Sequence, residues 1–191
     1  MVAPLPRSTS PQPASFTARD YWVLADSGAF RGFVKTELIE GELLVVNRVY
    51  ARHARVHADV AARLVIALRK LDTGPVGYMT PSTLLSEDSI PEPDIALAER
   101  TDEKALPGSL VKLAVEIADS SLMFVLDRKA NLYARHGIPE YWVFDVEGLT
   151  IYQHWQPGQH GYGQCHQYGF ADDLTAKTIA GLTLNLAYLK F

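Results

Sequence analysis

The stretch SLVKLAVEIAD, from Ser109 to Asp119, decides the fold class because its side chains alternate in character. Alternation with a period of two is the pattern of a β-strand. One face would be apolar, and the other is small apart from two charges; the two sets are Val111, Leu113, Val115 and Ile117, and Lys112, Ala114, Glu116 and Ala118. We therefore expect a strand that carries Glu116 on an otherwise alanine-lined face.

The chain after this strand predicts a helix and a hairpin. A helix from about Leu122 to His136 would end at Gly137, with Pro139 just beyond. EYWVFDVEGLTIYQHW (140–155) then predicts a hairpin that turns near Glu147-Gly148. The stretches QPGQHGYGQCHQYG (156–169) and LTAKTIAGLTLNL (174–186) are typical of loops and short strands.

The chain before it predicts further strands and the most regular helix. DIALAE (94–99) reads as a strand once Pro93 has set the chain extended, and GPVGYMTPSTLLS (74–86) as a turn with a short strand. From Arg52 to Leu71, apolar residues recur at spacings of three and four, which predicts a helix.

The start of the chain predicts a capped helix and a tight hairpin. Thr17 followed by Asp20 is a capping signal for a helix that ends near Gly28. VKTELIEGELLVV (34–46) would turn at Glu40-Gly41. The whole order predicts an α/β fold with a mixed sheet covered by helices and with additional hairpins.

Length and composition favour one domain. The chain has 191 residues, of which 48% are hydrophobic, and this suits a single unit with a sizeable core. MVAPLPRSTSPQPASF (1–16) contains four prolines and predicts a mobile tail, so the domain would span residues 17–191.

Charge and cysteine content limit the partners and the compartment. A formal net charge of −4 gives no global positive field for a polyanion, so nucleic-acid binding would need a local patch. Cys165 is the single cysteine, which excludes an internal disulfide and favours a reducing cytoplasm. No run of 18 apolar residues occurs, so we expect no membrane span.

Two carboxylates could share one pocket. Asp94 heads one predicted strand and Glu116 lies late in the next, both on faces lined by alanines. Two buried like charges are tolerated only with a proton or a cation between them, and Mg²⁺ binds a few carboxylates while keeping several waters. The alternative for Asp94 alone is a turn cap after Pro93, the commonest task of a Pro-Asp pair.

Lys129 is the candidate positive partner of these acids. Lys112 shares the face of Glu116 but lies four residues away, roughly 13 Å along a strand. Lys129 lies on the following helix, with Tyr133 one turn later, and a helix packed over the strand could bring its amine to the acids. Considered alone, Lys129 would be an ordinary solvated helix residue.

Several stretches together resemble one protein family. IPEPDIALAE (90–99), LAVEIADSS (113–121) and DRKANLYARHGIPEYWVFD (127–145) resemble, in order and spacing, the Uma2 family (DUF820) of restriction endonuclease-like proteins in the PD-(D/E)XK superfamily. ELIEGEL (37–43) fits the opening hairpin of that family. The resemblance runs from about Thr17 to Trp155, and YARHGIPEYWVFD (133–145) is its most specific part.

The resemblance implies a restriction endonuclease-like fold and assigns roles to residues. Asp94 would be the aspartate of the motif, Glu116 its second acid, Lys129 the lysine and Glu37 a third acid, with Mg²⁺ or Mn²⁺ as cofactor and a homodimer as the assembly. Two positions depart from the family pattern. Asp119-Ser120-Ser121 replaces a Ser-Pro-Ser type of loop, and Val125 stands where an aspartate is expected, with Asp127 as a possible substitute.

A basic band is the candidate DNA contact. The stretch from Arg48 to Lys70 contains six Arg or Lys residues and one acid, Asp59, and we single out Arg52, His53 and Arg55 as candidate DNA contacts. The same pattern suits the polar face of an amphipathic helix.

Two functions follow from these residues. The first is a Mg²⁺-dependent DNA endonuclease that uses Asp94, Glu116, Lys129 and Glu37. The alternative is an inactive module of the same fold that acts in dimerisation or ligand binding.

Overall fold

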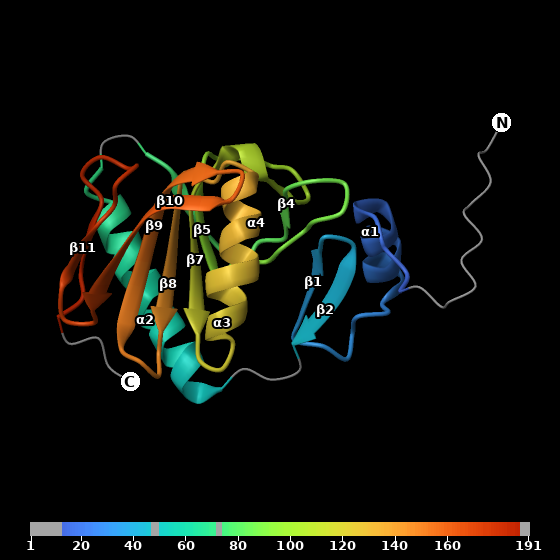
Figure 1. Cartoon of the computed structure of the whole chain (residues 1–191), viewed down its shortest axis with the longest axis horizontal. Coiled ribbons are helices and arrows are strands. Elements are labelled where there is room, and N and C mark those ends of the chain that lie inside the picture. The colour runs from blue at the N-terminus through green and yellow to red at the C-terminus, as the bar shows by residue number, and fades with distance from the viewer. Residues whose placement is uncertain (1–12, 47–49, 72–73, 188–191) are drawn as a thin grey trace.

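A six-stranded mixed sheet forms the centre of the protein, whose computed structural model describes residues 13–46, 50–71 and 74–187 (Figure 1). The strand order is β10-β9-β8-β7-β5-β3, and within it β7 and β8 pair in parallel while the other neighbours pair antiparallel. The strands are β3 (Val76–Met79), β5 (Ile95–Ala98), β7 (Val111–Ala118), β8 (Glu140–Asp145), β9 (Thr150–Gly158) and β10 (Gly161–Gly169). The predicted α/β fold with a mixed sheet is confirmed.

Helices cover both faces of this sheet. α2 (Ala51–Leu68) packs on one face, and the helical connection between β7 and β8 packs on the other (Figure 1). That connection consists of α3 (Leu122–Phe124), the π-helical segment η2 (Val125–Lys129) and α4 (Ala130–Arg135). The sheet is therefore enclosed, as its nearly continuous burial requires.

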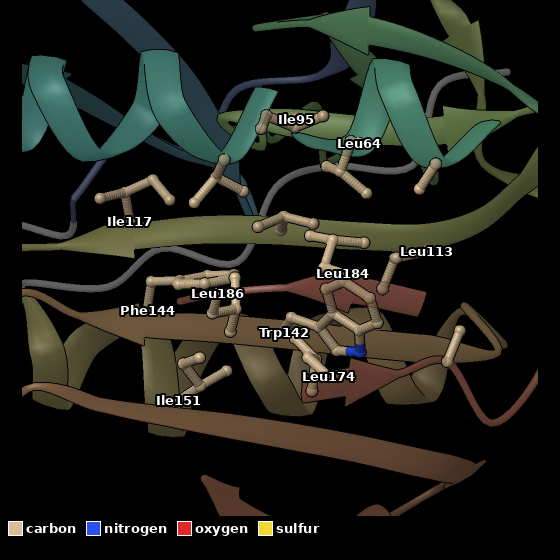
Figure 2. Packing of buried hydrophobic residues seen from close by; sticks show 14 of the residues in the cluster. Leu64, Ile95, Leu113, Ile117, Trp142, Phe144, Ile151, Leu174, Leu184 and Leu186 are labelled. Carbon is tan, nitrogen blue, oxygen red and sulfur yellow. The ribbon is translucent and has the colours of Figure 1, made fainter. Parts of the chain in front are cut away.

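The two faces of the sheet differ in side-chain size. Under α2 the core contains large residues, including Leu64, Leu113 and Trp142, shown in Figure 2. Under α4 the sheet presents small residues such as Ala96 and Ala114. The small side chains leave room on this second face for the charged residues described below.

The N-terminal part forms a helix and a separate hairpin beside the sheet. α1 (Ala18–Ser27) has the predicted capping box of Thr17 and Asp20. β1 (Lys35–Ile39) and β2 (Glu42–Val46) are joined at Glu40-Gly41, whose φ angles of 53° and 79° are both positive, as a type I′ turn requires. Both predictions are confirmed.

Shorter elements complete the structure. β4 (Thr83–Leu84) pairs with β6 (Leu106–Pro107), the 3₁₀ turn η1 (Gly108–Leu110) precedes β7, and β11 (Asp173–Thr175) pairs with β12 (Thr183–Asn185). Phe16, in the predicted tail, donates its backbone N–H to the Gly41 carbonyl at 2.9 Å. Residues 1–12 of that tail lie outside the described residues. Within the described residues, no helix is long and apolar enough to cross a membrane.

The predicted helix from Leu122 to His136 is present as α3, η2 and α4, with π-helical hydrogen bonding in η2. Two other local predictions are wrong. Val111 belongs to the alanine-lined face instead of the face of Leu113, because the pairing of β5 with β7 shifts register next to Ala98. The residues from 156 to 169, predicted as loops and short strands, form the end of β9 and all of β10 in one long hairpin.

A buried carboxylate ties the C-terminal segment to the sheet. Glu140, fully buried at the start of β8, accepts hydrogen bonds from Trp142 Nε1 at 2.6 Å and Gln153 Nε2 at 2.7 Å. Its second oxygen accepts from the backbone N–H groups of Lys177 and Thr178 at 2.9 and 2.8 Å, and from the Thr178 hydroxyl at 2.8 Å. These five donors are all neutral groups.

Candidate active site

A cavity of about 740 Å³ lies where the β1–β2 hairpin, the start of α2 and the end of β7 meet. Its inner wall contains four predicted site residues, all nine-tenths or more buried: Asp94, Glu116, Lys129 and Glu37. The structure thus brings together side chains from β1, β7, η2 and the segment before β5. Its mouth is apolar, with Val34, Val45, Val46 and Tyr50 exposed there.

Asp94 and Glu116 face each other because their strands are antiparallel neighbours. Ile95 pairs with Val115, so the residue before Ile95 comes opposite the residue after Val115. Asp94 Oδ2 accepts the backbone N–H of Ile117 at 2.7 Å. Asp94 is therefore buried in the cavity wall and hydrogen-bonded to β7. It is not simply a cap of the turn after Pro93.

Lys129 joins the two glutamates. Its ammonium group donates to Glu116 Oε1 at 2.6 Å and to Glu37 Oε1 at 2.7 Å. Tyr133, one turn later on α4, donates its hydroxyl to the same Glu116 oxygen at 3.1 Å. Glu37 also accepts the backbone N–H of Glu92 at 2.6 Å. Placing Lys129 at the end of a π-helical segment is typical of functional sites, where such segments often occur.

A second lysine that sequence reasoning missed enters the same cavity. Lys35, on β1, has its Nζ atom 3.5 Å from Asp94 Oδ1 and 3.9 Å from Glu37 Oε1. The available signal was the two-residue period of a strand, which places Lys35 on the same face as Glu37.

The residues of the basic band have different partners in the structure. His53 Nε2 lies 3.4 Å from Asp94 Oδ2, so this ring contacts the acidic centre. Arg52 is bound to Asp119, with Nε donating to Oδ2 at 2.8 Å, while Arg55 is exposed on α2. Arg48 lies outside the described residues.

Val125, where the family pattern has an aspartate, and Asp127, its suggested substitute, have different surroundings. Val125 is buried and lines the cavity, so an apolar side chain occupies that part of the wall. Asp127 is exposed and accepts a hydrogen bond from Asn131 at 3.0 Å. Asp127 therefore does not take the place of an acid at position 125.

The charges of the centre shift its pKa values in opposite directions. Burial opposes ionisation of Asp94, yet His53 and Lys35 hold its pKa well below the usual range. Burial raises the pKa of Glu116, even though Lys129 and Lys35 oppose the rise. For Glu37, the attraction of Lys129 and Lys35 outweighs burial and lowers the pKa.

The donor set fits a hard divalent cation. Asp94 and Glu116 offer carboxylate oxygens to one cavity, and Mg²⁺ needs only one or two carboxylates when waters and substrate phosphate complete its shell. Within the described residues, no group of three or more His, Cys, Asp or Glu side chains could hold a metal ion by itself. The chemistry of the site thus suits Mg²⁺ or Mn²⁺ with open positions instead of a closed protein cage.

Comparison with family models gives a match over residues 29–187, to the model named Uma2 and described as “Putative restriction endonuclease”. The chain belongs to the Uma2 family. The match includes the three acids at the centre of the cavity, Glu37, Asp94 and Glu116, and both of its lysines, Lys35 and Lys129. The Uma2 resemblance seen in the sequence is therefore confirmed. Among curated proteins, none matches the sequence.

A solved structure shares the fold of this Uma2 protein. It is the crystal structure of a “putative nuclease belonging to DUF820” from Anabaena variabilis ATCC 29413. The two chains are 14% identical, with a TM-score of 0.64 over 81% of this chain and 88% of the other. At this identity the likeness concerns the fold alone.

Proposed function

We propose that this Uma2 protein is a metal-dependent endonuclease that hydrolyses phosphodiester bonds in DNA. The observation that carries the proposal is the pairing of Asp94 with Glu116 on neighbouring strands, at the wall of one cavity that also contains lysine ammonium groups. Family membership supports the same reaction class. Asp94 and Glu116 would hold the cation, and Lys129 with Glu37 completes the centre.

The reaction is a simple hydrolysis. The oxygen of one water molecule bonds to phosphorus, the bond from phosphorus to one ester oxygen breaks, and one proton of the water ends on that leaving oxygen. The other proton stays with the new phosphomonoester until solvent removes it. A bound divalent cation supplies a polarised phosphoryl oxygen and a more acidic water.

The residues of this chain fix the carboxylates for that task. Ile117 N–H holds one oxygen of Asp94, and Lys129 with Tyr133 holds one oxygen of Glu116. The second oxygen of Asp94 lies 3.5 Å from Lys35 Nζ, and Glu116 accepts its two hydrogen bonds through one oxygen only. Such fixed groups reduce reorganisation when charge develops on the phosphate.

Cleavage of supercoiled plasmid DNA tests the proposal. We expect nicking with Mg²⁺ or Mn²⁺, no nicking with a chelator, and a loss of at least about 100-fold in Asp94→Ala. Asp127→Ala is the matched control, because Asp127 is an exposed aspartate away from the cavity. Persistent metal-dependent activity in Asp94→Ala would refute the assignment, and single-stranded RNA in parallel reactions would show whether DNA is the preferred substrate.

One observation favours the alternative of an inactive module. Val125 fills part of the cavity wall where the family pattern has an acid. Isothermal titration with Mg²⁺ or Mn²⁺ separates the two functions, since an intact fold without metal binding would favour dimerisation or ligand binding. The homodimer, the cytoplasmic location and the DNA contacts of Arg52, His53 and Arg55 remain parts of the proposal, and sedimentation would measure the assembly.

A further inference from the structure

The two lysines of the cavity have different surroundings. Lys129 is 2% exposed, and its ammonium group has two short hydrogen bonds to Glu37 and Glu116. An ammonium group has three donors, so two of the three are already committed to carboxylates. Moving this group to a substrate would leave two buried glutamates without their cation, which is strongly unfavourable.

Lys35 has longer contacts and more exposure. Its side chain is 15% exposed and lines the cavity, and its Nζ atom lies 3.5 Å from Asp94 and 3.9 Å from Glu37. These distances exceed the usual length of a hydrogen bond from an ammonium group to a carboxylate. The ammonium group of Lys35 therefore has donors that are not committed to short hydrogen bonds with Asp94 or Glu37.

The hairpin that carries Lys35 is firmly held. Arg128 donates to Glu42 Oε2 at 2.6 Å and to the Ile39 carbonyl at 3.1 Å, and Tyr21 donates to the Thr36 carbonyl at 2.8 Å. A fixed strand with a long side chain places a charge at the substrate while letting its tip adjust. The nearby carboxylates of Asp94 and Glu37 favour the charged form of this amine.

We propose that Lys35 is the catalytic ammonium group that contacts the scissile phosphate, and that Lys129 is a positioning residue that fixes Glu37 and Glu116. The inference rests on the proposed function and names the group that offsets negative charge as the phosphodiester is hydrolysed. The inference assigns the substrate contact to Lys35 of the β1–β2 hairpin and not to Lys129 of the helix.

A second consequence concerns the cation. Lys35 and a divalent cation both approach Asp94, so the ammonium group competes with the metal for that carboxylate. Removing the ammonium group would therefore leave Mg²⁺ binding as strong as in the wild type, or make it stronger. A lysine that organised the acids would give the opposite result.

The experiment compares Lys35→Met with Lys112→Met. Lys112 lies on β7, the strand of Glu116, but its side chain is 38% exposed and pairs with Glu99 away from the cavity. We expect Lys35→Met to cleave plasmid about 100- to 1,000-fold more slowly, a loss typical of removing one stabilising donor. Its melting temperature should stay within about 3 °C of the wild type, and its Mg²⁺ dissociation constant should be equal or lower. Lys112→Met should match the wild type in all three measurements.

Each outcome decides the inference. Cleavage by Lys35→Met within about threefold of the wild type would overturn it, and so would Mg²⁺ binding weakened by about tenfold or more. If Lys35→Met fails to fold, Lys35→Gln, which keeps a polar tip without charge, is measured against the same limits. A wild-type protein that cleaves nothing with Mg²⁺ or Mn²⁺ would instead refute the proposed function, and the inference with it.

Discussion

Two buried glutamates of this protein, Glu140 and Glu116, have their negative charge stabilised in different ways. Glu140 is fully buried and both of its oxygens are covered by five neutral donors. Glu116 is 3% exposed, has one oxygen bound by Lys129 and Tyr133, and lines a cavity. Glu140 joins segments of the fold, whereas Glu116 is left with capacity for a ligand.

The difference shows how a carboxylate can be buried and still be available. Fixed neutral donors satisfy a carboxylate completely, so no ligand can bind without breaking them. Glu116 accepts hydrogen bonds at one oxygen only, from Lys129 and Tyr133, so a second cation can approach it from the cavity. The comparison therefore predicts that a change at Glu140 lowers stability without affecting Mg²⁺ binding, whereas a change in the centre around Glu116 affects ligand binding.

The largest expected effect comes from Lys129→Met. This change leaves Glu37 and Glu116 buried without their shared cation, and breaking a buried pair in this way typically costs about 3–5 kcal/mol. Urea unfolding at pH 8 measures the loss. Because the pKa of Glu116 is raised, its protonated form is the favoured one as pH falls, so the loss should be smaller at pH 5. A loss below about 1 kcal/mol at pH 8 would contradict the assigned role of Lys129.

A smaller effect is expected from Glu140→Gln. An amide presents an NH₂ group to donors that now meet a carboxylate oxygen, so charge-assisted hydrogen bonds are lost and stability should fall by about 2–3 kcal/mol. Titration with Mg²⁺ should give wild-type affinity. Glu103→Gln, at an exposed glutamate, is the control and should change stability by about 0.5 kcal/mol or less. Weakened Mg²⁺ binding in Glu140→Gln would contradict the assignment of Glu140 to stability alone.

The smallest effect concerns pH and His53. Burial lowers the pKa of His53, but the contact with Asp94 and the charge of Glu116 outweigh both burial and Lys35, so the folded pKa is raised above 6.5. The folded protein thus binds this proton more tightly, and the resulting stability is complete below pH 6.5 and disappears as pH rises through the folded pKa. The ring of His57 lies roughly parallel to that of His53, with 6.3 Å between the ring centroids.

Urea unfolding of wild type and His53→Gln at pH values from 5.5 to 8.5 would measure this effect. We expect the difference in unfolding free energy to shrink by less than about 1 kcal/mol across that range, because His53 is partly exposed. Taking the difference removes the other histidines, whose contributions are common to both proteins. A difference that stays constant with pH would show that His53 does not titrate with the acidic centre.

Local patterns were sufficient for most of the fold. The capping box at Thr17, the turn at Glu40-Gly41 and the alternation of β7 from Leu113 onward each follow from interactions within a few residues, and the structure contains all three. The π-helical segment and the register shift at Ala98 depend on packing between distant elements. No local pattern encodes such packing, so these features were not predictable.

Some residues of the site were likewise predictable from the sequence, and others were not. Alanines around Glu116 and the strand order predicted that Asp94 and Glu116 would meet, and helix packing predicted Lys129. Lys35 was missed because a lysine at the start of a strand is usually solvated, and only the contacts of β1 with the segment from Ile90 to Asp94 place it in the cavity. The five donors of Glu140 come from β8, β9 and residues near 178, so that cluster also needed coordinates.

Every described contact among Asp94, Glu116, Glu37 and the two lysines is made within one chain. Under the proposed function, one chain would supply both metal-binding acids and both lysines for one incision. If two copies associate on a duplex, their mutual arrangement would set the stagger between the two incisions, while the chemistry of each incision would stay local to its own subunit.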